Sequence, residues 1–125
     1  MADASGHLLS GLRALVVEDE AVISFLLEDM LGELGAAEVR HAASVRAGLS
    51  ALDTARPDFA VLDVNLGGER VYPVAERLEK DGVPFVFITG YGKSGMDARW
   101  ADKSVVQKPF NLDMLTSALR ALLKR

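Results

Sequence analysis

Short apolar runs alternate along the chain with longer stretches in which apolar residues recur at helical spacing. The runs 14–17, 59–62 and 85–89 predict buried strands, and the weaker runs 38–42 and 104–107 predict a second and a fifth strand. Helical periodicity predicts helices over about 21–34, 45–55, 71–81 and 112–122. The stretch 90–102 is rich in Gly and poor in apolar period, so we expect a short or disordered fourth helix there.

This alternation predicts five βα units, (βα)5. The strand runs are continuously apolar, which is typical of strands covered on both faces, and intervening helices favour right-handed crossovers and a parallel sheet. Five units are too few for an eight-stranded barrel. We therefore expect an α/β fold with a doubly wound, five-stranded parallel sheet of the flavodoxin-like type, formed by residues 11–125 after a flexible N-terminal tail at 1–10.

Composition narrows the functional classes. The 125 residues carry a net charge of −4, which gives no basic excess for binding nucleic acid. The chain has no Cys, so disulfides, thiolate zinc sites and thiol nucleophiles are excluded. No apolar run approaches the roughly 20 residues of a membrane helix, and the first residues lack the features of a signal peptide. We expect a cytoplasmic protein without a membrane or nucleic-acid partner.

Acidic and polar side chains follow the predicted strands at the point where each strand ends. They are Glu18 and Asp19 after the first strand, Asp63 after the third, Thr89 after the fourth and Lys108 after the fifth. Parallel strands share one carboxyl edge, so these side chains are expected to meet there. Clustered carboxylates without nearby His or Cys suit a hard cation, Mg²⁺ or Mn²⁺. With a Lys and a hydroxyl beside them they indicate a phosphoryl-transfer site, in which Asp63 is the natural nucleophile.

Short motifs at these strand ends resemble the receiver domain of bacterial two-component response regulators. They are Val16-Val17-Glu18-Asp19-Glu20, Leu62-Asp63, Thr89-Gly90 and Lys108-Pro109-Phe110. The resemblance extends over about residues 12–123 and implies that Asp63 is the phosphoacceptor, which becomes a 4-aspartylphosphate. It further implies a metal site of Glu18, Asp19, Asp63 and the main-chain carbonyl of Asn65. Phosphoryl-binding and switch roles fall on Thr89, Gly90 and Lys108.

The same resemblance implies a role in phosphorelay signal transduction. A histidine kinase or a histidine phosphotransfer protein would donate the phosphoryl group in a Mg²⁺-dependent reaction. Residues 11–125 would be a stand-alone receiver domain with no output domain, expected to be a monomer. It would signal by protein contact or act as a phosphate sink, catalysing only its own phosphorylation and dephosphorylation.

A narrower resemblance lies around the fourth strand. The segment Pro84-Phe85-Val86-Phe87-Ile88-Thr89-Gly90-Tyr91 is similar to the Pro-Phe-x-Phe-Ala-Thr-Gly-x-Tyr signature of an alphaproteobacterial subgroup, often stand-alone receivers paired with kinases of the HWE or related classes. Ile88 replaces the Ala, and Tyr91 falls one position early. Val105 stands where ordinary receivers carry an aromatic switch residue. Tyr91 is therefore either a partly exposed loop aromatic or a substitute gate or switch.

Other functions remain as alternatives. A small aspartyl-phosphate phosphatase of the haloacid dehalogenase type also attacks with a strand-end Asp, but it needs a second Asp where this chain has Asn65. An electron-transfer flavodoxin would place FMN phosphate against the acids at 18–20, which would repel it. A scaffold that works without phosphorylation would not need the complete acceptor set. Glu20 is interpreted as a first-turn helix acid and not as a ligand.

Overall fold

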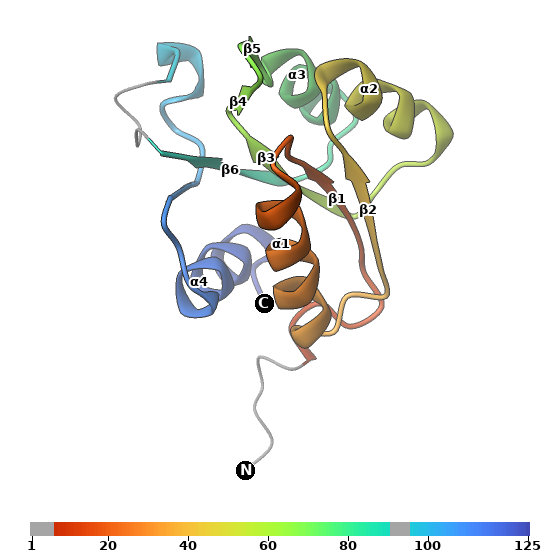
Figure 1. Cartoon of the computed structure of the whole chain (residues 1–125). Helices are drawn as coiled ribbons and strands as arrows, with labels where there is room; N and C mark the ends of the chain where they lie inside the picture. The colour runs from red at the N-terminus through yellow and green to blue at the C-terminus, as the bar shows by residue number, and fades with distance from the viewer. Residues whose placement is uncertain (1–6, 91–95) are drawn as a thin grey trace.

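A five-stranded parallel sheet forms the centre of the computed structural model, which describes residues 7–90 and 96–125. The strand order is β2-β1-β3-β6-β7, and α1 and α4 cover one face while α2 and α3 cover the other (Figure 1). The strands are β1 (Arg13–Val17), β2 (Glu38–Ala42), β3 (Phe59–Asp63), β6 (Phe85–Thr89) and β7 (Val105–Gln107). The helices are α1 (Ala21–Glu33), α2 (Val45–Thr54), α3 (Tyr72–Lys80) and α4 (Leu112–Leu123). The predicted doubly wound, flavodoxin-like fold is confirmed.

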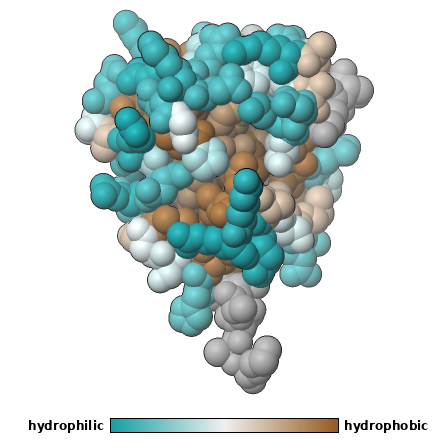
Figure 2. Space-filling model, turned by 180° about the vertical axis from the view of Figure 1, so that it is seen from behind, coloured by the Kyte–Doolittle hydropathy of each residue, from teal (hydrophilic) through white to brown (hydrophobic). Residues whose placement is uncertain are grey.

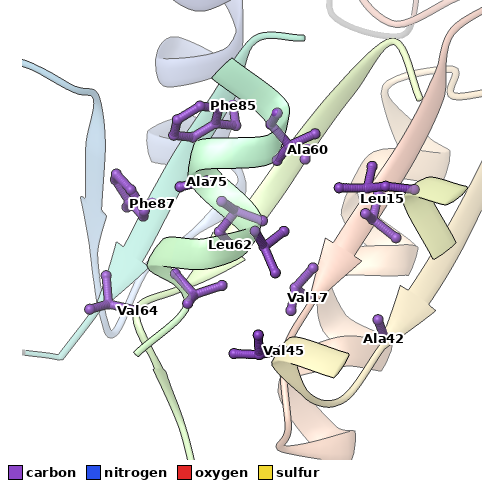
Figure 3. Close-up of a cluster of buried hydrophobic side chains, with 14 of the residues drawn as sticks. Leu15, Val17, Ala42, Val45, Ala60, Leu62, Val64, Ala75, Phe85 and Phe87 are labelled. Carbon is purple, nitrogen blue, oxygen red and sulfur yellow. The ribbon is translucent and has the colours of Figure 1, made fainter. Parts of the chain in front are cut away.

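Each face of the sheet buries its own layer of side chains. Successive strand residues point to opposite faces, so β1 sends Leu15 and Val17 toward α2 and α3, and Ala14 and Val16 toward α1 and α4. Figure 3 shows the first of these layers, in which Val45 and other helix residues meet the strand side chains. Burial on both faces explains why the strand sequences are continuously apolar.

Hydrophobic residues are not confined to the interior. The view from behind shows them gathered in the middle of that face, with hydrophilic side chains around them (Figure 2). Much of the accessible surface of any folded protein is apolar, so this distribution alone does not mark a functional site.

A short 3-10 helix, η3 (Ala98–Trp100), lies in residues 96–104 of the connection between β6 and β7. Trp100 is only 2% exposed, and its ring stacks on that of Tyr72 with 5.8 Å between centroids. Arg99 forms ion pairs with two glutamates of α3 at 2.9 and 3.1 Å. The predicted short fourth helix is confirmed over these residues, which aromatic and ionic contacts hold against α3.

A two-stranded hairpin that the sequence analysis did not predict follows β3. Strand β4 (Asn65–Leu66) pairs antiparallel with β5 (Glu69–Arg70). The turn between them is Gly67-Gly68, with φ of +57° and +95°. Two consecutive residues with positive φ are the feature of tight hairpin turns that favours glycine. The hairpin places Asn65 and Gly67 beside the carboxyl edge of the sheet.

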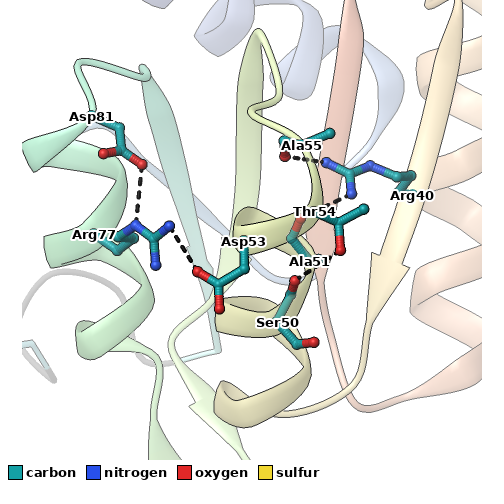
Figure 4. A network of polar contacts seen from close by, with 8 residues as sticks. All are labelled: Arg40, Ser50, Ala51, Asp53, Thr54, Ala55, Arg77 and Asp81. Atoms are coloured by element: carbon teal, nitrogen blue, oxygen red, sulfur yellow. Dashed lines mark hydrogen bonds and ion pairs between the residues drawn. The ribbon is translucent and has the colours of Figure 1, made fainter.

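Polar contacts fix α2 between its neighbours (Figure 4). The Arg77 guanidinium of α3 lies 2.9 Å from the Asp53 carboxylate of α2. On the other side, Arg40 of β2 donates hydrogen bonds to the main-chain oxygens of Ala51 and Ala55, at 3.0 and 2.8 Å. The Ala51 oxygen also accepts the Ala55 N–H at 3.2 Å, so Arg40 adds a second donor to that carbonyl and a donor to the Ala55 carbonyl just past the end of the helix.

The predicted flexible tail at 1–10 is wrong for its last residues. Leu8 and Leu9 are 5% and 0% exposed, and they join the apolar cluster beneath α1 and α4. The Leu9 N–H donates to the Leu34 oxygen at 2.8 Å, and Ser10 forms an isolated bridge with Ala36. Burial of two leucines offsets the entropy of ordering this segment. Residues 1–6 lie outside the described part of the chain.

Ser44 caps α2, and this contact supports a quantitative prediction. Its Oγ accepts a hydrogen bond from the Ala47 N–H at 3.0 Å. Ser44→Ala leaves that N–H without its partner, so we expect the free energy of unfolding to fall by about 1 kcal/mol in chemical denaturation. Ser50→Ala, at an exposed position of the same helix, is the matched control and should be neutral or slightly stabilising. Equal losses in both variants would contradict a stabilising role for the cap.

Candidate functional site

The carboxyl ends of β1, β3, β6 and β7 meet at one edge of the sheet. Strand β3 lies at the centre and pairs in parallel with β1 and β6, so Asp63 has neighbours on both sides. Glu18 and Asp19 follow β1 directly, and Lys108 follows β7. The Lys108 N–H donates to the Thr89 oxygen at 2.9 Å, which fixes the start of the loop after β7. The strand-end residues are thus brought together as the sequence predicts.

Three carboxylates form the acidic part of this site. Glu18, Asp19 and Asp63 each offer an oxygen atom, and these atoms lie within 4.8 Å of one another. Glu18 and Asp63 are 3% and 4% exposed, whereas Asp19 is exposed. The main chain holds two of them, because Glu18 Oε2 accepts from the Glu20 N–H at 3.0 Å and Asp63 Oδ1 accepts from the Asn65 N–H at 3.2 Å.

Burial sets the protonation of Glu18. Desolvation of its carboxyl, a side-chain hydrogen bond with Asp63 and the charge of Asp63 together raise the pKa of Glu18 to about 8. The hydrogen bond from the Glu20 N–H and the charge of Lys108 lower this pKa but do not outweigh burial. Glu18 Oε1 is buried and accepts no hydrogen bond, although the Lys108 ammonium lies 3.3 Å from it. The site therefore holds a carboxyl group that an additional cation would stabilise in its charged form.

Lys108 is the basic member of the site. Its Nζ lies 3.2 Å from Asp63 Oδ2, 3.3 Å from Glu18 Oε1 and 3.7 Å from Glu20 Oε1. Partial burial lowers the pKa of Lys108, but the charges of Asp63 and Glu18 outweigh it, so the net pKa lies above the usual value. One ammonium thus faces three carboxylates, and the cluster as a whole is short of positive charge.

A cavity of about 460 Å³ opens onto this cluster. Its lining residues are Asp19, Glu20, Asp63, Asn65, Gly67, Gly90 and Lys108. Two of them are glycines, which keep the cavity wide. A Cβ at Gly67 would come within 3.6 Å of Asp19 Oδ2, and a Cβ at Gly90 would meet no atom within 4 Å. A group of the size of phosphate can therefore reach Asp63 from solvent.

Thr89 is 3% exposed and lies at the end of β6, on the carboxyl edge of the sheet, but it is not among the residues that line the cavity. Tyr91 lies outside the described residues, so its predicted role as gate or switch stays a prediction.

Glu20 and Gly67 also line the site, although neither residue is predicted there from the sequence. Glu20 is the N-cap residue of α1 and not a first-turn acid, and its carboxylate turns toward Lys108. The run of three acids directly after β1 was the available signal for Glu20. The Gly67-Gly68 pair signalled only a turn, and nothing in the sequence placed that turn over Asp19.

The donor set fits a hard divalent cation. Carboxylate oxygens are the preferred ligands of Mg²⁺ and Mn²⁺, and in this cluster the buried Glu18 Oε1, which accepts no hydrogen bond and pairs with Lys108, lies beside two further carboxylates. Among the described residues, no His or Cys joins the group.

Comparison with known proteins identifies the arrangement. The family model of the response regulator receiver domain matches residues 14–120. The chain belongs to the response regulator receiver family. Receiver domains are signalling modules that act with histidine kinases or phosphotransfer proteins and generally bind Mg²⁺. This assignment leaves the phosphatase alternative without support.

Curated relatives show the same family in longer proteins. The receiver domain is 39% identical over 129 residues to the transcriptional regulatory protein TcrA of Mycobacterium tuberculosis, a match that covers 94% of this chain and 48% of TcrA. It is 29% identical to the sensory transduction protein LytT of Bacillus subtilis, covering 87% of this chain and 47% of LytT. The chain thus spans about half the length of these relatives.

Solved structures include receivers of similar length. The solution structure of SdrG from Sphingomonas melonis Fr1 is 43% identical, with a TM-score of 0.81, and the match covers 93% of this chain and 98% of SdrG. The BeF3-activated conformation of SdrG is 44% identical, with a TM-score of 0.78, covering 89% of this chain and 95% of that one. In the described part of this receiver, no helix combines the length and apolar character needed to cross a membrane.

Proposed function

We propose that this receiver domain accepts a phosphoryl group on Asp63 from a phosphohistidine of a histidine kinase or a histidine phosphotransfer protein. The observation that carries the proposal is the contact between the buried Asp63 carboxylate and Lys108 Nζ, 3.2 Å apart, at the floor of an open cavity. A nucleophile, a positively charged side chain and a cavity that admits the donor are thus combined at one place.

The transfer balances as a single displacement. A carboxylate oxygen of Asp63 forms a bond to phosphorus while the bond between phosphorus and the donor imidazole nitrogen breaks. That nitrogen keeps the electron pair and takes up a proton from solvent, so the donor leaves as neutral imidazole. Lys108 Nζ is placed to move from the Asp63 oxygen to an oxygen of the phosphoryl group, where it offsets the added charge. Thr89 and Gly90, at the end of β6, are assigned the remaining contacts to the phosphoryl oxygens.

A divalent cation fits the acidic side of the same cavity. Asp19, Asp63 and the main-chain carbonyl of Asn65 would hold Mg²⁺ or Mn²⁺, with Glu18 as the buried fourth member. The bound ion would supply charge neutralisation for the carboxylates and the phosphoryl oxygens. Glu18, Asp19 and Asp63 would in turn orient it through the main-chain contacts that already fix two of these side chains.

Phosphorylation of a receiver has to be passed on to another protein or end in loss of the phosphoryl group. We infer that this one acts by protein–protein contact or as a phosphate sink, as a cytoplasmic monomer, with a kinase of the HWE or a related class as the donor. The similarity to SdrG, for which a BeF3-activated conformation has been determined, supports a phosphorylation-dependent change of conformation.

The proposed function is tested by phosphorylation in solution. The purified chain is incubated with acetyl phosphate and Mg²⁺, and intact-mass spectrometry follows the reaction. We expect the mass of one phosphoryl group to be added, no addition when a chelator removes Mg²⁺, and release of the group by hydroxylamine, which cleaves acyl phosphates. A modified chain that resists hydroxylamine would contradict an aspartyl phosphate.

Metal binding gives a second expected result. Mg²⁺ at a concentration tenfold above its dissociation constant should raise the free energy of unfolding by about 1.4 kcal/mol through mass action. Asp19→Asn removes an exposed ligand and should weaken this stabilisation, whereas Asp29→Asn, an exposed position of α1, should leave it unchanged. Thermal unfolding with and without Mg²⁺ measures the effect, and identical curves for the wild type would contradict the metal site.

A further inference from the structure

Glu20 and Lys108 together form a wall between two neighbouring cavities. Both residues line the phosphoacceptor cavity of about 460 Å³ and also an adjoining hollow of about 390 Å³. The second hollow is bounded further by Ile23 and Leu26 of α1 and by residues 109–110. Glu20 is therefore an exposed acid on the lining of the cavity that a phosphodonor has to enter.

Glu20 differs from Glu18 and Asp63 in its exposure to solvent. The side chains of Glu18 and Asp63 are 0% and 6% exposed and lie 3.3 and 3.2 Å from Lys108 Nζ. The Glu20 side chain is 66% exposed and lies 3.7 Å from the same atom. Lys108 is thus closer to the two buried acids, and the Glu20 carboxylate, although it also lies near Lys108, remains largely exposed to solvent on the cavity lining.

We propose that Glu20 is a specificity-determining residue that disfavours small dianionic phosphodonors by charge repulsion. This inference rests on the proposed function of Asp63. A free donor such as acetyl phosphate brings two negative charges past Glu20 and has no further contacts to offset the repulsion. A phosphohistidine on a protein partner gains binding energy from the remainder of the partner's surface, which offsets the same repulsion.

Two phosphodonors of different net charge distinguish charge repulsion by Glu20 from an effect of Glu20 on the chemical step. Acetyl phosphate is a dianion at neutral pH, whereas phosphoramidate is a monoanion. In both reactions a carboxylate oxygen of Asp63 bonds to phosphorus, and either the acetate oxygen leaves with the electron pair or the nitrogen leaves as ammonia with its protons. Because the bond formed is the same, a difference between donors in their response to Glu20 reports on charge at the cavity lining and not on the chemistry.

Glu20→Gln tests the proposal. Initial rates of phosphorylation are measured by intact-mass spectrometry with each donor, in Mg²⁺, at low ionic strength and at about 1 M salt, where charge effects are screened. We expect Glu20→Gln to raise kcat/KM for acetyl phosphate about three- to tenfold, through a lower KM, with a smaller rise for phosphoramidate. At high salt the gain should disappear.

Glu33→Gln is the matched control, since it makes the same charge change on an exposed residue at the far end of α1. If Glu20→Gln behaves like Glu33→Gln, the Glu20 charge has no effect on donor choice and the inference is wrong. If Glu20→Gln slows both donors equally, the inference is also wrong, and Glu20 acts by holding Lys108. A wild-type chain that no donor phosphorylates would instead contradict the proposed function itself, so the two failures are distinguishable.

Discussion

Asp63→Asn will abolish the hydroxylamine-sensitive phosphorylation of this receiver. An amide is a poor nucleophile toward phosphorus, and Asp63 Oδ2 is the oxygen that Lys108 holds 3.2 Å away at the floor of the cavity. The expected loss is complete within the sensitivity of intact-mass spectrometry, with acetyl phosphate or a cognate kinase as donor. No other change in the site should have as large an effect on the reaction.

Stability measurements separate this chemical effect from misfolding. Asp63→Asn removes a buried charge from a cluster with a shortage of positive charge, so the metal-free variant should be at least as stable as the wild type. Asp29→Asn makes the same chemical change on an exposed face and should be phosphorylated normally. Robust labelling of Asp63→Asn would show that another residue is the acceptor.

Glu18→Gln will change how stability depends on pH in metal-free buffer. The folded protein raises the pKa of Glu18 to about 8, above the value of 4.5 for an unperturbed Glu, so the folded state retains a proton that the unfolded state loses. Between about pH 4.5 and 8, this group therefore makes the wild type progressively less stable as pH rises. Gln mimics the neutral acid and removes that loss.

The free energies of unfolding of the wild type and of Glu18→Gln can be compared at two pH values. We expect Glu18→Gln to be more stable than the wild type at pH 8.5 by on the order of 2 kcal/mol and to differ little at pH 4.5, as measured by denaturant unfolding in a chelator. For Glu33→Gln, on the exposed end of α1, the free energy of unfolding should change with pH as it does in the wild type. If Glu18→Gln also shows the pH dependence of the wild type, burial does not perturb the pKa of the Glu18 carboxyl.

The sequence predicts the sheet and the strand-end cluster because both depend on strong local patterns. Continuous apolar runs such as 59–62 specify strands buried on both faces, and a parallel sheet then brings every strand end to one edge. Asp63 and Lys108, 45 positions apart, meet for this reason. Their contact requires only the correct order of strands and no detailed packing.

Other features depend on tertiary contacts that leave little trace in the sequence. Leu8 and Leu9 are two apolar residues without a period, and their burial depends on packing in the apolar cluster that includes Leu34. The β4–β5 hairpin has two residues in each strand, too few for an alternating pattern. The direction of the Glu20 side chain follows from its place as the N-cap of α1 beside Lys108, and composition cannot indicate it.

The central claim is that Asp63 is the phosphoacceptor, and chemical trapping tests it most directly. Borohydride reduces an aspartyl phosphate to homoserine, so the phosphorylated chain is reduced, digested and sequenced by tandem mass spectrometry. The account predicts homoserine at position 63 and at no other acidic position, with a yield that falls to background when Mg²⁺ is chelated. Homoserine at position 19, or an unreduced Asp63 in a chain that carries the phosphoryl group, would contradict it.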